Sequence, residues 1–254
     1  MLGIFVFFPF IPLLIGSFSS VWRFGDLLPT KFSLSAYEYI INNNFTLSSI
    51  KYNIIISYSV ALINLILAMP ASYFLARTES ALKKIYIIIL FAPLIIPPLS
   101  SILGIHFNMI MYGLTGNLLG IILVNVIPSF PYVLLVLLMA FRNFPSSLEE
   151  AALIDGVSKY SIYRYIFIPL LIPNIVVAST ISILISLSEY ILTFLIGGSK
   201  IITLPILMFP FLSGGDKNIG AVYSILFIIV NILALLLFEF FIVLAIKRYS
   251  RIRI

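Results

Sequence analysis

Acidic side chains are scarce in this chain: 254 residues contain only 9 Asp and Glu. Glu149 and Glu150 lie in a polar segment between two long apolar runs, directly before Ala151 and Ala152. Glu189 stands alone within a later apolar run. Neither arrangement pairs a carboxylate with a nucleophile or with a second metal ligand. The first arrangement favours a protein contact, and the second favours a polar site inside a membrane, where an unpaired carboxylate is costly.

Residues typical of catalysis are few. The chain has no Cys and one His, and a lone imidazole such as His106, without a nearby carboxylate, is more typical of a packed side chain than of a metal ligand or catalytic base. Serines are plentiful, but no base partners them, which disfavours an intramembrane hydrolase. No Gly-Lys pair occurs, so the P-loop of ATPases is absent. The sequence therefore predicts neither catalytic residues, nor a metal site, nor a bound cofactor.

The polar segment has the signals of a short helix. Ser146 and Ser147 each precede a glutamate by three residues, which is the pattern of a capping box at a helix start. The following Gly156 favours the left-handed conformation that ends helices. We therefore expect a helix of about two to three turns that begins near Ser146 or Ser147 and stops at Gly156.

One face of this helix is shallow enough for close docking against another protein, since small residues recur at helical spacing. Ser158 is placed to cap a second short helix, and a proline marks the start of the next apolar run. An amphipathic helix lying on the bilayer surface is the alternative interpretation. The residues concerned are Leu148, Ala151, Ala152, Asp155 and Pro169.

The composition indicates that lipid is the solvent. Hydrophobic residues make up 62% of the chain and charged residues 9%, and the mean hydropathy is +1.20. Apolar stretches of roughly 20 residues, enough to cross a hydrocarbon core of about 30 Å, recur along the whole length. This predicts an all-α integral membrane protein with a single domain over residues 1–254 and six spans, at about 2–21, 52–76, 85–107, 117–141, 169–196 and 219–246.

Prolines inside three consecutive predicted spans indicate kinked helices around a translocation path, because a kink in a membrane needs protein or water to satisfy the freed carbonyl. These residues are Pro70, Pro93, Pro97, Pro98, Pro128 and Pro131.

Basic residues set the expected orientation. The net charge of +6 reflects membrane orientation rather than nucleic-acid binding, because Lys and Arg fall in the gaps between apolar runs and cytoplasmic loops carry the excess. The polar segment and the C-terminus are therefore expected in the cytoplasm of a cell-membrane protein. The ten basic residues on that side are Arg77, Lys83, Lys84, Arg142, Lys159, Arg164, Lys247, Arg248, Arg251 and Arg253, against Arg23, Lys31, Lys51, Lys200 and Lys217 on the other.

The spacing of the polar segment closely resembles the cytoplasmic EAA loop of permease subunits from binding-protein-dependent ABC importers. Glu150-Ala151-Ala152 is followed by three residues, Gly156, nine residues and Ile166-Phe167-Ile168-Pro169, with Ile168 in place of the usual Leu. The resemblance implies the type I importer fold, with core helices over about 50–210 and a coupling loop over about 142–168. It assigns contacts with a separate ATPase to Glu150, Ala151, Ala152, Asp155, Gly156, Ile166 and Pro169.

The same resemblance implies partners. Two ABC ATPase subunits would bind the ATP and Mg²⁺, a second permease subunit, expected to be a different sister chain, would complete the pathway, and an extracellular or periplasmic solute-binding protein would deliver the solute. A channel or secondary transporter is the alternative class, but neither explains a capped shallow helix between Ser146 and Gly156.

The prediction of the solute rests on the segment between Ser186 and Gly198 and on the Thr203-Leu204-Pro205 that follows. This stretch is most similar to the spermidine/putrescine permeases, although permeases for iron, phosphonate, molybdate and sugars share parts of it. Glu189, with Ser186 and Tyr190, is therefore a candidate for a pathway that carries a cation. The alternative is a structural hydrogen bond from the Glu189 carboxylate to Asn64, Asn125 or Asn231.

Overall fold

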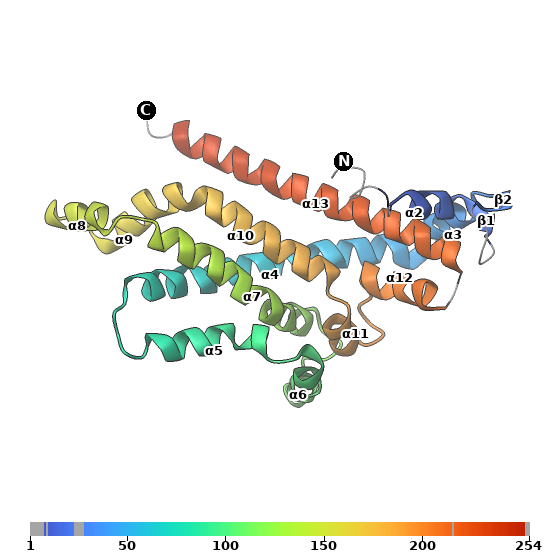
Figure 1. Ribbon diagram of the computed structural model, residues 1–254, viewed down its shortest axis with the longest axis horizontal. Helices are drawn as coiled ribbons and strands as arrows, with labels where there is room; N and C mark the ends of the chain where they lie inside the picture. Colours follow the sequence, from blue (N-terminus) through green and yellow to red (C-terminus); the bar gives the residue numbers. More distant parts are fainter. Residues whose placement is uncertain (1–7, 9, 23–27, 215, 252–254) are drawn as a thin grey trace.

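The computed structural model describes residues 8, 10–22, 28–214 and 216–251, which form an elongated bundle of helices (Figure 1). Three helices make the centre of the bundle and pack against one another: α4 (Asn44–Arg77), α7 (Leu118–Arg142) and α10 (Ile168–Ser188). Helices are expected here because an apolar segment in lipid must satisfy its backbone hydrogen bonds within itself.

The remaining elements flank this centre. At one end lie α2 (Phe10–Ser17), α3 (Ser35–Asn42) and a hairpin of β1 (Ser19–Val21) and β2 (Lys31–Phe32), in which Ser19 pairs with Phe32. The long α13 (Lys217–Arg251) packs against α2 and α12. The others are α5 (Lys83–Ile95), α6 (Pro98–Met111), α8 (Ser146–Ile154), α9 (Lys159–Ile162), the π-helix η1 (Tyr163–Phe167), α11 (Ile191–Gly197) and α12 (Leu204–Ser213).

Within the described residues, four helices are long and apolar enough to cross a membrane, and the bent pair α5–α6 would make a fifth. The predicted count of six is thus not reached there. The predicted first span, 2–21, holds the eight-residue α2 followed by β1, and its residues 2–7 and 9 lie outside the described part. The four helices are Asn44–Arg77, Leu118–Arg142, Lys159–Ser188 and Lys217–Ile242.

The predicted span 85–107 bends sharply at two of the prolines from which a kink was predicted. It is divided into α5 and α6, which are bent by 100° relative to each other. Ile96 and Pro97 between them are extended, with ψ of 125° and 128°. Each of these residues precedes a proline, and the proline ring disfavours the helical conformation of the residue before it. The consecutive Pro97 and Pro98 therefore account for the break.

The predicted span 169–196 also differs from the structure. A continuous helical segment starts ten residues earlier, at Lys159, and ends at Ser188. Glu189 is extended, with φ −71° and ψ 117°, and a separate short helix, α11, follows. Glu189 therefore lies at a break between two helices and not within a helix.

Uncharged polar side chains join the central helices. The Asn64 amide of α4 donates to Ser129 Oγ of α7 at 2.7 Å and to Ser182 Oγ of α10 at 2.8 Å. Asn125 of α7 donates to Thr193 Oγ1 of α11 at 3.1 Å. All five of these side chains are buried. Such hydrogen bonds hold membrane helices together where water-driven burial does not operate.

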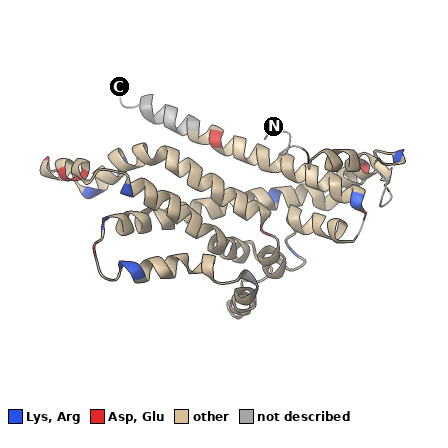
Figure 2. Cartoon of the chain, in the orientation of Figure 1, with Lys and Arg blue, Asp and Glu red and all other residues tan. Residues whose placement is uncertain are grey.

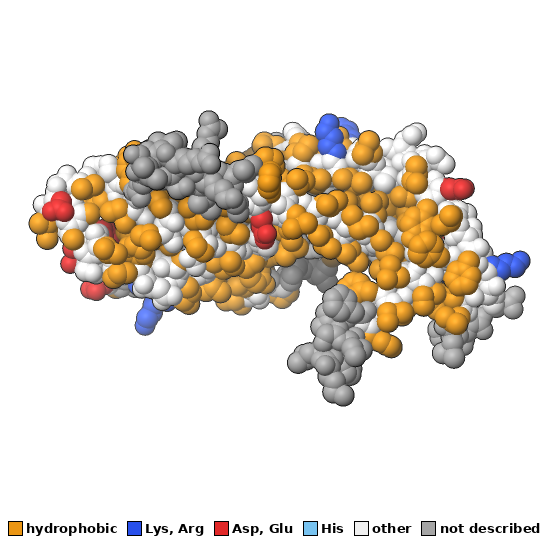
Figure 3. Space-filling view, turned by 90° about the horizontal axis from the view of Figure 1, so that it is seen from above, with side chains coloured by type: hydrophobic (Ala, Val, Ile, Leu, Met, Phe, Trp, Pro, Cys, Tyr) orange, Lys and Arg blue, Asp and Glu red, His pale blue; other side chains and the backbone are white. Residues whose placement is uncertain are grey.

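Most charged residues lie toward the two ends of the bundle (Figure 2), and hydrophobic side chains dominate the face seen in Figure 3. The loop between α4 and α5, the segment α8–α9 and the C-terminal part of α13 lie toward one end, and α2, α3 and the hairpin lie toward the other (Figure 1). The apolar flank between two polar ends matches the expected position of a bilayer. Arg23 and Arg253 lie outside the described residues, and so do the side chains of Lys247, Arg248 and Arg251.

Candidate coupling site

Helix α8 begins at Ser146, as predicted, but the predicted capping boxes are not formed. The residue before the helix is Pro145, and no side chain caps the first turn. The physical reason lies in the tertiary structure. Glu149, which would close one box by turning back to the helix start, instead turns toward α4, where Arg77 and Tyr73 hold its carboxylate.

The predicted end of α8 is confirmed. Gly156 has φ +78°. Its N–H donates to the carbonyl of Leu153 at 3.1 Å, and the N–H of Val157 donates to the carbonyl of Ala152 at 3.0 Å. This pair of bonds is the Schellman motif, which needs a left-handed residue and so favours glycine. The chain reverses sharply here, and α8 projects from the end of the bundle (Figure 1).

The return to the membrane is helical throughout. Ser158 Oγ accepts the N–H of Ser161 at 3.2 Å and so caps α9, as predicted. The π-helix η1, which was not predicted, then leads into α10 with Pro169 in its first turn. Pro169 lacks the N–H that would bond to Tyr165 in an α-helix, and a widened turn of this kind accommodates such a missing bond without breaking the helix.

An ion pair fastens α8 to α4. Arg77 Nε lies 3.3 Å from Glu149 Oε2, and the Tyr73 hydroxyl donates to Glu149 Oε1. Arg77 also donates through Nη1 and Nη2 to the carbonyl of Phe144, at 3.2 Å each. The side chains of Arg77 and Glu149 are 22% and 14% exposed, so water screens this pair less than a pair on the surface. No sequence signal pointed to Tyr73, and Arg77 was predicted only as a basic residue that sets the membrane orientation.

Aromatic rings pack behind this ion pair. The Tyr73 ring lies 5.6 Å from that of Phe141 and 5.7 Å from that of Phe167, and Phe144 lies 5.1 Å from Phe167. Phe141 and Phe167 are buried. Aromatic rings at these separations attract each other beyond simple burial. The base of the loop is thus anchored to α4, α7 and η1 together.

The structure divides the residues that the resemblance assigns to ATPase contact. Glu150, Ala151, Asp155 and Gly156 are exposed, whereas Ala152 is half-buried against the hydrophobic core. Ile166 and Pro169 are also half-buried. The predicted shallow face is therefore only partly free. The projecting loop also exposes apolar side chains: Ile154 is 85% exposed, Leu148 48% and Leu153 40%. The prediction did not assign Ile154 or Leu153 to contact with the ATPase.

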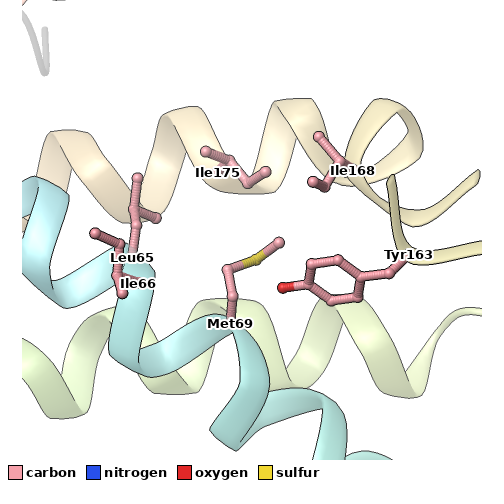
Figure 4. Close-up of a pocket in the computed structure, with 6 residues that line it drawn as sticks. All are labelled: Leu65, Ile66, Met69, Tyr163, Ile168 and Ile175. Carbon is pink, nitrogen blue, oxygen red and sulfur yellow. The ribbon is translucent and has the colours of Figure 1, made fainter. Parts of the chain in front are cut away.

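A small apolar pocket lies between α4 and the base of α10 (Figure 4). Its volume is about 230 Å³, and the Tyr163 hydroxyl points across it toward Met69. The pocket carries no charge and borders the π-helix. The lining residues are Leu65, Ile66, Met69, Tyr163, Ile168 and Ile175.

The candidate pathway residues meet at the break between α10 and α11. Glu189 Oε1 accepts the N–H of Leu192 at 3.1 Å, so the carboxylate caps the start of α11. Tyr190, half-buried, stacks on Phe209 of α12 with ring centroids 4.4 Å apart. Ser186 is buried, and its hydroxyl has no hydrogen-bond partner among the described residues.

The amides considered as partners of Glu189 are engaged elsewhere, so that part of the structural alternative is wrong. Asn64 donates to two serines and Asn125 to Thr193, while Asn231 donates to the carbonyl of Phe227 at 2.7 Å. The backbone of the next helix is the partner instead. No group of three His, Cys, Asp or Glu side chains that could hold a metal occurs in the part of the chain that the structure describes.

Comparison with known proteins decides the family. Residues 62–251 match the family described as binding-protein-dependent transport system inner membrane component. The chain belongs to this family. It is thus a multi-pass membrane component of an ABC importer and not an enzyme. The match includes α8 and the start of α10, the segment whose EAA pattern predicted such a protein.

Two curated relatives illustrate the similarity. The chain is 26% identical over 196 residues to the diacetylchitobiose uptake system permease protein of Streptomyces coelicolor, which covers 75% of this chain and 64% of the relative. It is 30% identical over 210 residues to the melibiose/raffinose/stachyose import permease protein of Bacillus subtilis, covering 82% of this chain and 74% of that one. The chain thus spans slightly less than two thirds of the first relative.

A solved structure supports the fold. The crystal structure of a bacterial ABC transporter involved in the import of the acidic polysaccharide alginate contains a chain that superimposes with a TM-score of 0.74 at 18% sequence identity. The superposition covers 94% of this chain and 91% of that one. The similarity establishes the helical fold of an ABC importer permease, while the low identity carries no information on the solute.

Proposed function

We propose that this chain forms part of the translocation pathway of an ATP-driven importer and receives mechanical work through α8. The observation that carries the proposal is the build of α8, which projects beyond the bundle and is closed by Gly156, with Ile154 85% exposed. An apolar side chain at the tip of a short helix is costly in water unless a partner covers it. In the proposed complex, Glu150, Ala151, Asp155 and Gly156 contact the ATPase directly.

Ala152, Ile166 and Pro169 support the coupling site from within in this proposal. Ala152 and Ile166 already pack against the core of this chain, so they fix the orientation of α8 rather than fill a groove on the ATPase. The α8 end of the bundle faces the cytoplasm of a cell membrane, in keeping with the basic residues Arg77, Lys83 and Arg142 near that end. Closure of two ATPase subunits on ATP and Mg²⁺ then moves the membrane helices.

The proposed complex contains a second permease subunit and a solute-binding protein on the opposite side. Uncovered apolar surface suits lipid and a sister subunit: Ile66 is 62% exposed and Phe241 is also 62% exposed. Whether the sister is a copy of this chain is open to a direct test, since a tagged copy expressed with an untagged copy would retain it only in a homodimer.

For the solute we propose a carbohydrate rather than a polyamine. Relatives named for oligosaccharides support this choice, although a spermidine/putrescine permease of Haemophilus influenzae is also similar, at 24% identity over 89% of this chain. The local chemistry also favours an uncharged solute. One oxygen of the Glu189 carboxylate is engaged with the backbone N–H of Leu192, and the Tyr190 ring beside it is stacked on Phe209.

Substitution of Glu189 distinguishes a carbohydrate from a cation as the solute. The amide oxygen of glutamine can accept the Leu192 N–H as the carboxylate does. Glu189→Gln is therefore expected to retain transport within about twofold, since amide and carboxylate side chains cap helices about equally well. Uptake by a reconstituted complex is the measurement. A pathway that attracts cations through this charge would instead lose most of its transport on Glu189→Gln.

Co-purification tests the function itself. Affinity-tagged chain is expressed with the ATPase and binding-protein genes of its source and extracted in mild detergent. We expect the ATPase to be retained on the column and its activity to rise when the loaded binding protein is added. Absence of the ATPase from complexes of properly folded chain would contradict the proposal and favour a channel or secondary transporter.

A further inference from the structure

We infer that Tyr73, Arg77 and Glu149 form a rigid joint that makes α8 move as one piece with α4. This inference rests on the proposed function and goes beyond it. Docking of α8 explains how force enters the chain, whereas the joint determines which membrane helix receives that force. The residues act by positioning α8 and do not touch the solute or the nucleotide.

The joint connects segments far apart in the sequence. Tyr73 and Arg77 lie one turn apart at the end of α4, so both side chains reach the same side of the helix. Their common target is one carboxylate: Tyr73 donates to Glu149 Oε1, and Arg77 Nε lies 3.3 Å from Oε2. Both oxygens of Glu149 are therefore held from α4, which restricts rotation as well as separation of α8.

A second contact keeps the joint from sliding. Arg77 donates through both terminal nitrogens to the carbonyl of Phe144, in the short link between α7 and α8. The Phe144 ring packs on Phe167, which in turn contacts Tyr73. One arginine thus binds both the approach to α8 and the first turn of α8.

The connection from α8 to α10 has a different character. It passes through the Gly156 turn, the short α9 and the π-helix η1, and Met69 of α4 and Tyr163 of η1 both line an apolar pocket of about 230 Å³ (Figure 4). A π-turn and an unfilled space are places where a helix can shift at low cost. Movement of α8 is therefore passed directly to α4, while α10 follows through a compliant link.

A double-mutant cycle tests the joint in the assembled transporter with its ATPase and binding protein. The variants are Arg77→Met, Glu149→Gln and the double variant, and the measured quantity is solute transported per ATP hydrolysed. Each single variant is expected to lower this ratio by about tenfold, because removing one partner of a part-buried pair leaves the other uncompensated. The double variant is expected to fall no further than the more affected single variant, since both act through one interaction.

Controls and milder variants keep the test decisive. Glu79→Gln and Arg142→Met change exposed charges near the same end and should leave the ratio unchanged. Tyr73→Phe keeps the ring packing and removes the hydroxyl, so it should lower the ratio by about threefold even if the charge variants fail to assemble, in line with the loss of one hydrogen bond to a charged group. Arg77→Lys, which keeps the charge, should recover part of the ratio.

The outcomes also separate this inference from the proposed function. If the wild-type chain retains no ATPase, the proposed function fails. If the ATPase is retained and transport is coupled, but Tyr73→Phe, Arg77→Met and Glu149→Gln all preserve the ratio, the inferred joint is contradicted while the proposed function stands. Strictly additive effects in the cycle would also overturn it, because independent residues would then be responsible.

Discussion

Replacing Ile154 by aspartate is expected to weaken binding of the partner ATPase by at least about 30-fold, the effect of losing a central apolar contact worth about 2 kcal/mol. Ile154 is 85% exposed at the tip of α8, so the substitution removes no packing within this chain. A charge in its place would have to be desolvated in the complex. The measurement is the amount of ATPase that co-purifies with the tagged chain across a titration of ATPase.

Ile41 provides the matched control. It is 80% exposed, lies in α3 at the opposite end of the bundle and is also an isoleucine on a short helix. Ile41→Asp should leave ATPase binding unchanged. Equal losses for Ile41→Asp and Ile154→Asp would mean that the added charge acts on the chain in general, and retention of the ATPase by Ile154→Asp would contradict docking through this part of α8.

Replacing Gly120 by alanine is expected to destabilise the chain severely. A Cβ at this position would lie 2.0 Å from the carbonyl oxygen of Leu114, a backbone atom that cannot move without shifting the loop before α7. Overpacking against backbone costs about 3 kcal/mol or more. The buried neighbours Ile121 and Ile122 belong to the hydrophobic core, so a shift at Gly120 would disturb them too. The measurement is the melting temperature of the detergent-solubilised chain, which should fall markedly.

Gly104→Ala is the control for this substitution. Gly104 lies within α6, and a Cβ there would meet nothing within 4 Å. Alanine is favoured over glycine in a helix interior by about 1 kcal/mol, so the melting temperature should stay or rise slightly. Comparable melting temperatures for Gly120→Ala and the unmodified chain would show that the loop and α7 are not packed as the structure has them.

Local sequence signals predicted the coupling loop well where local chemistry decides the structure. Gly156 ends α8 and Ser158 caps α9 because each makes its hydrogen bonds within a few residues of its own position. The role of Glu149 could not be read in the same way. Its partners Tyr73 and Arg77 lie more than 70 residues earlier in the chain, and only the folded packing of α4 against the loop brings them together.

The membrane spans were likewise predicted only in part from the sequence. Composition predicted the apolar helices, and α7 agrees with the predicted 117–141 within a residue at either end. Apolar runs do not show where a helix bends. The prolines predicted a kink in the span that divides at Pro97, whereas the break at Glu189 was missed. Pro97 and Pro98 carried the signal for this bend, since two adjacent prolines exclude a straight helix. Glu189 carried a weaker one, as a helix-capping acid two residues before a new helix.

Labelling of a single introduced cysteine tests the central claim most directly, and the chain, which has no Cys, needs no other change. Ile154→Cys is treated with a membrane-impermeant maleimide in intact cells and in inside-out vesicles, with and without bound ATPase. We predict no labelling in intact cells, strong labelling in vesicles stripped of ATPase and protection when the ATPase is restored. Labelling of Ile154→Cys from outside intact cells, or equal labelling with and without the ATPase, would contradict the account.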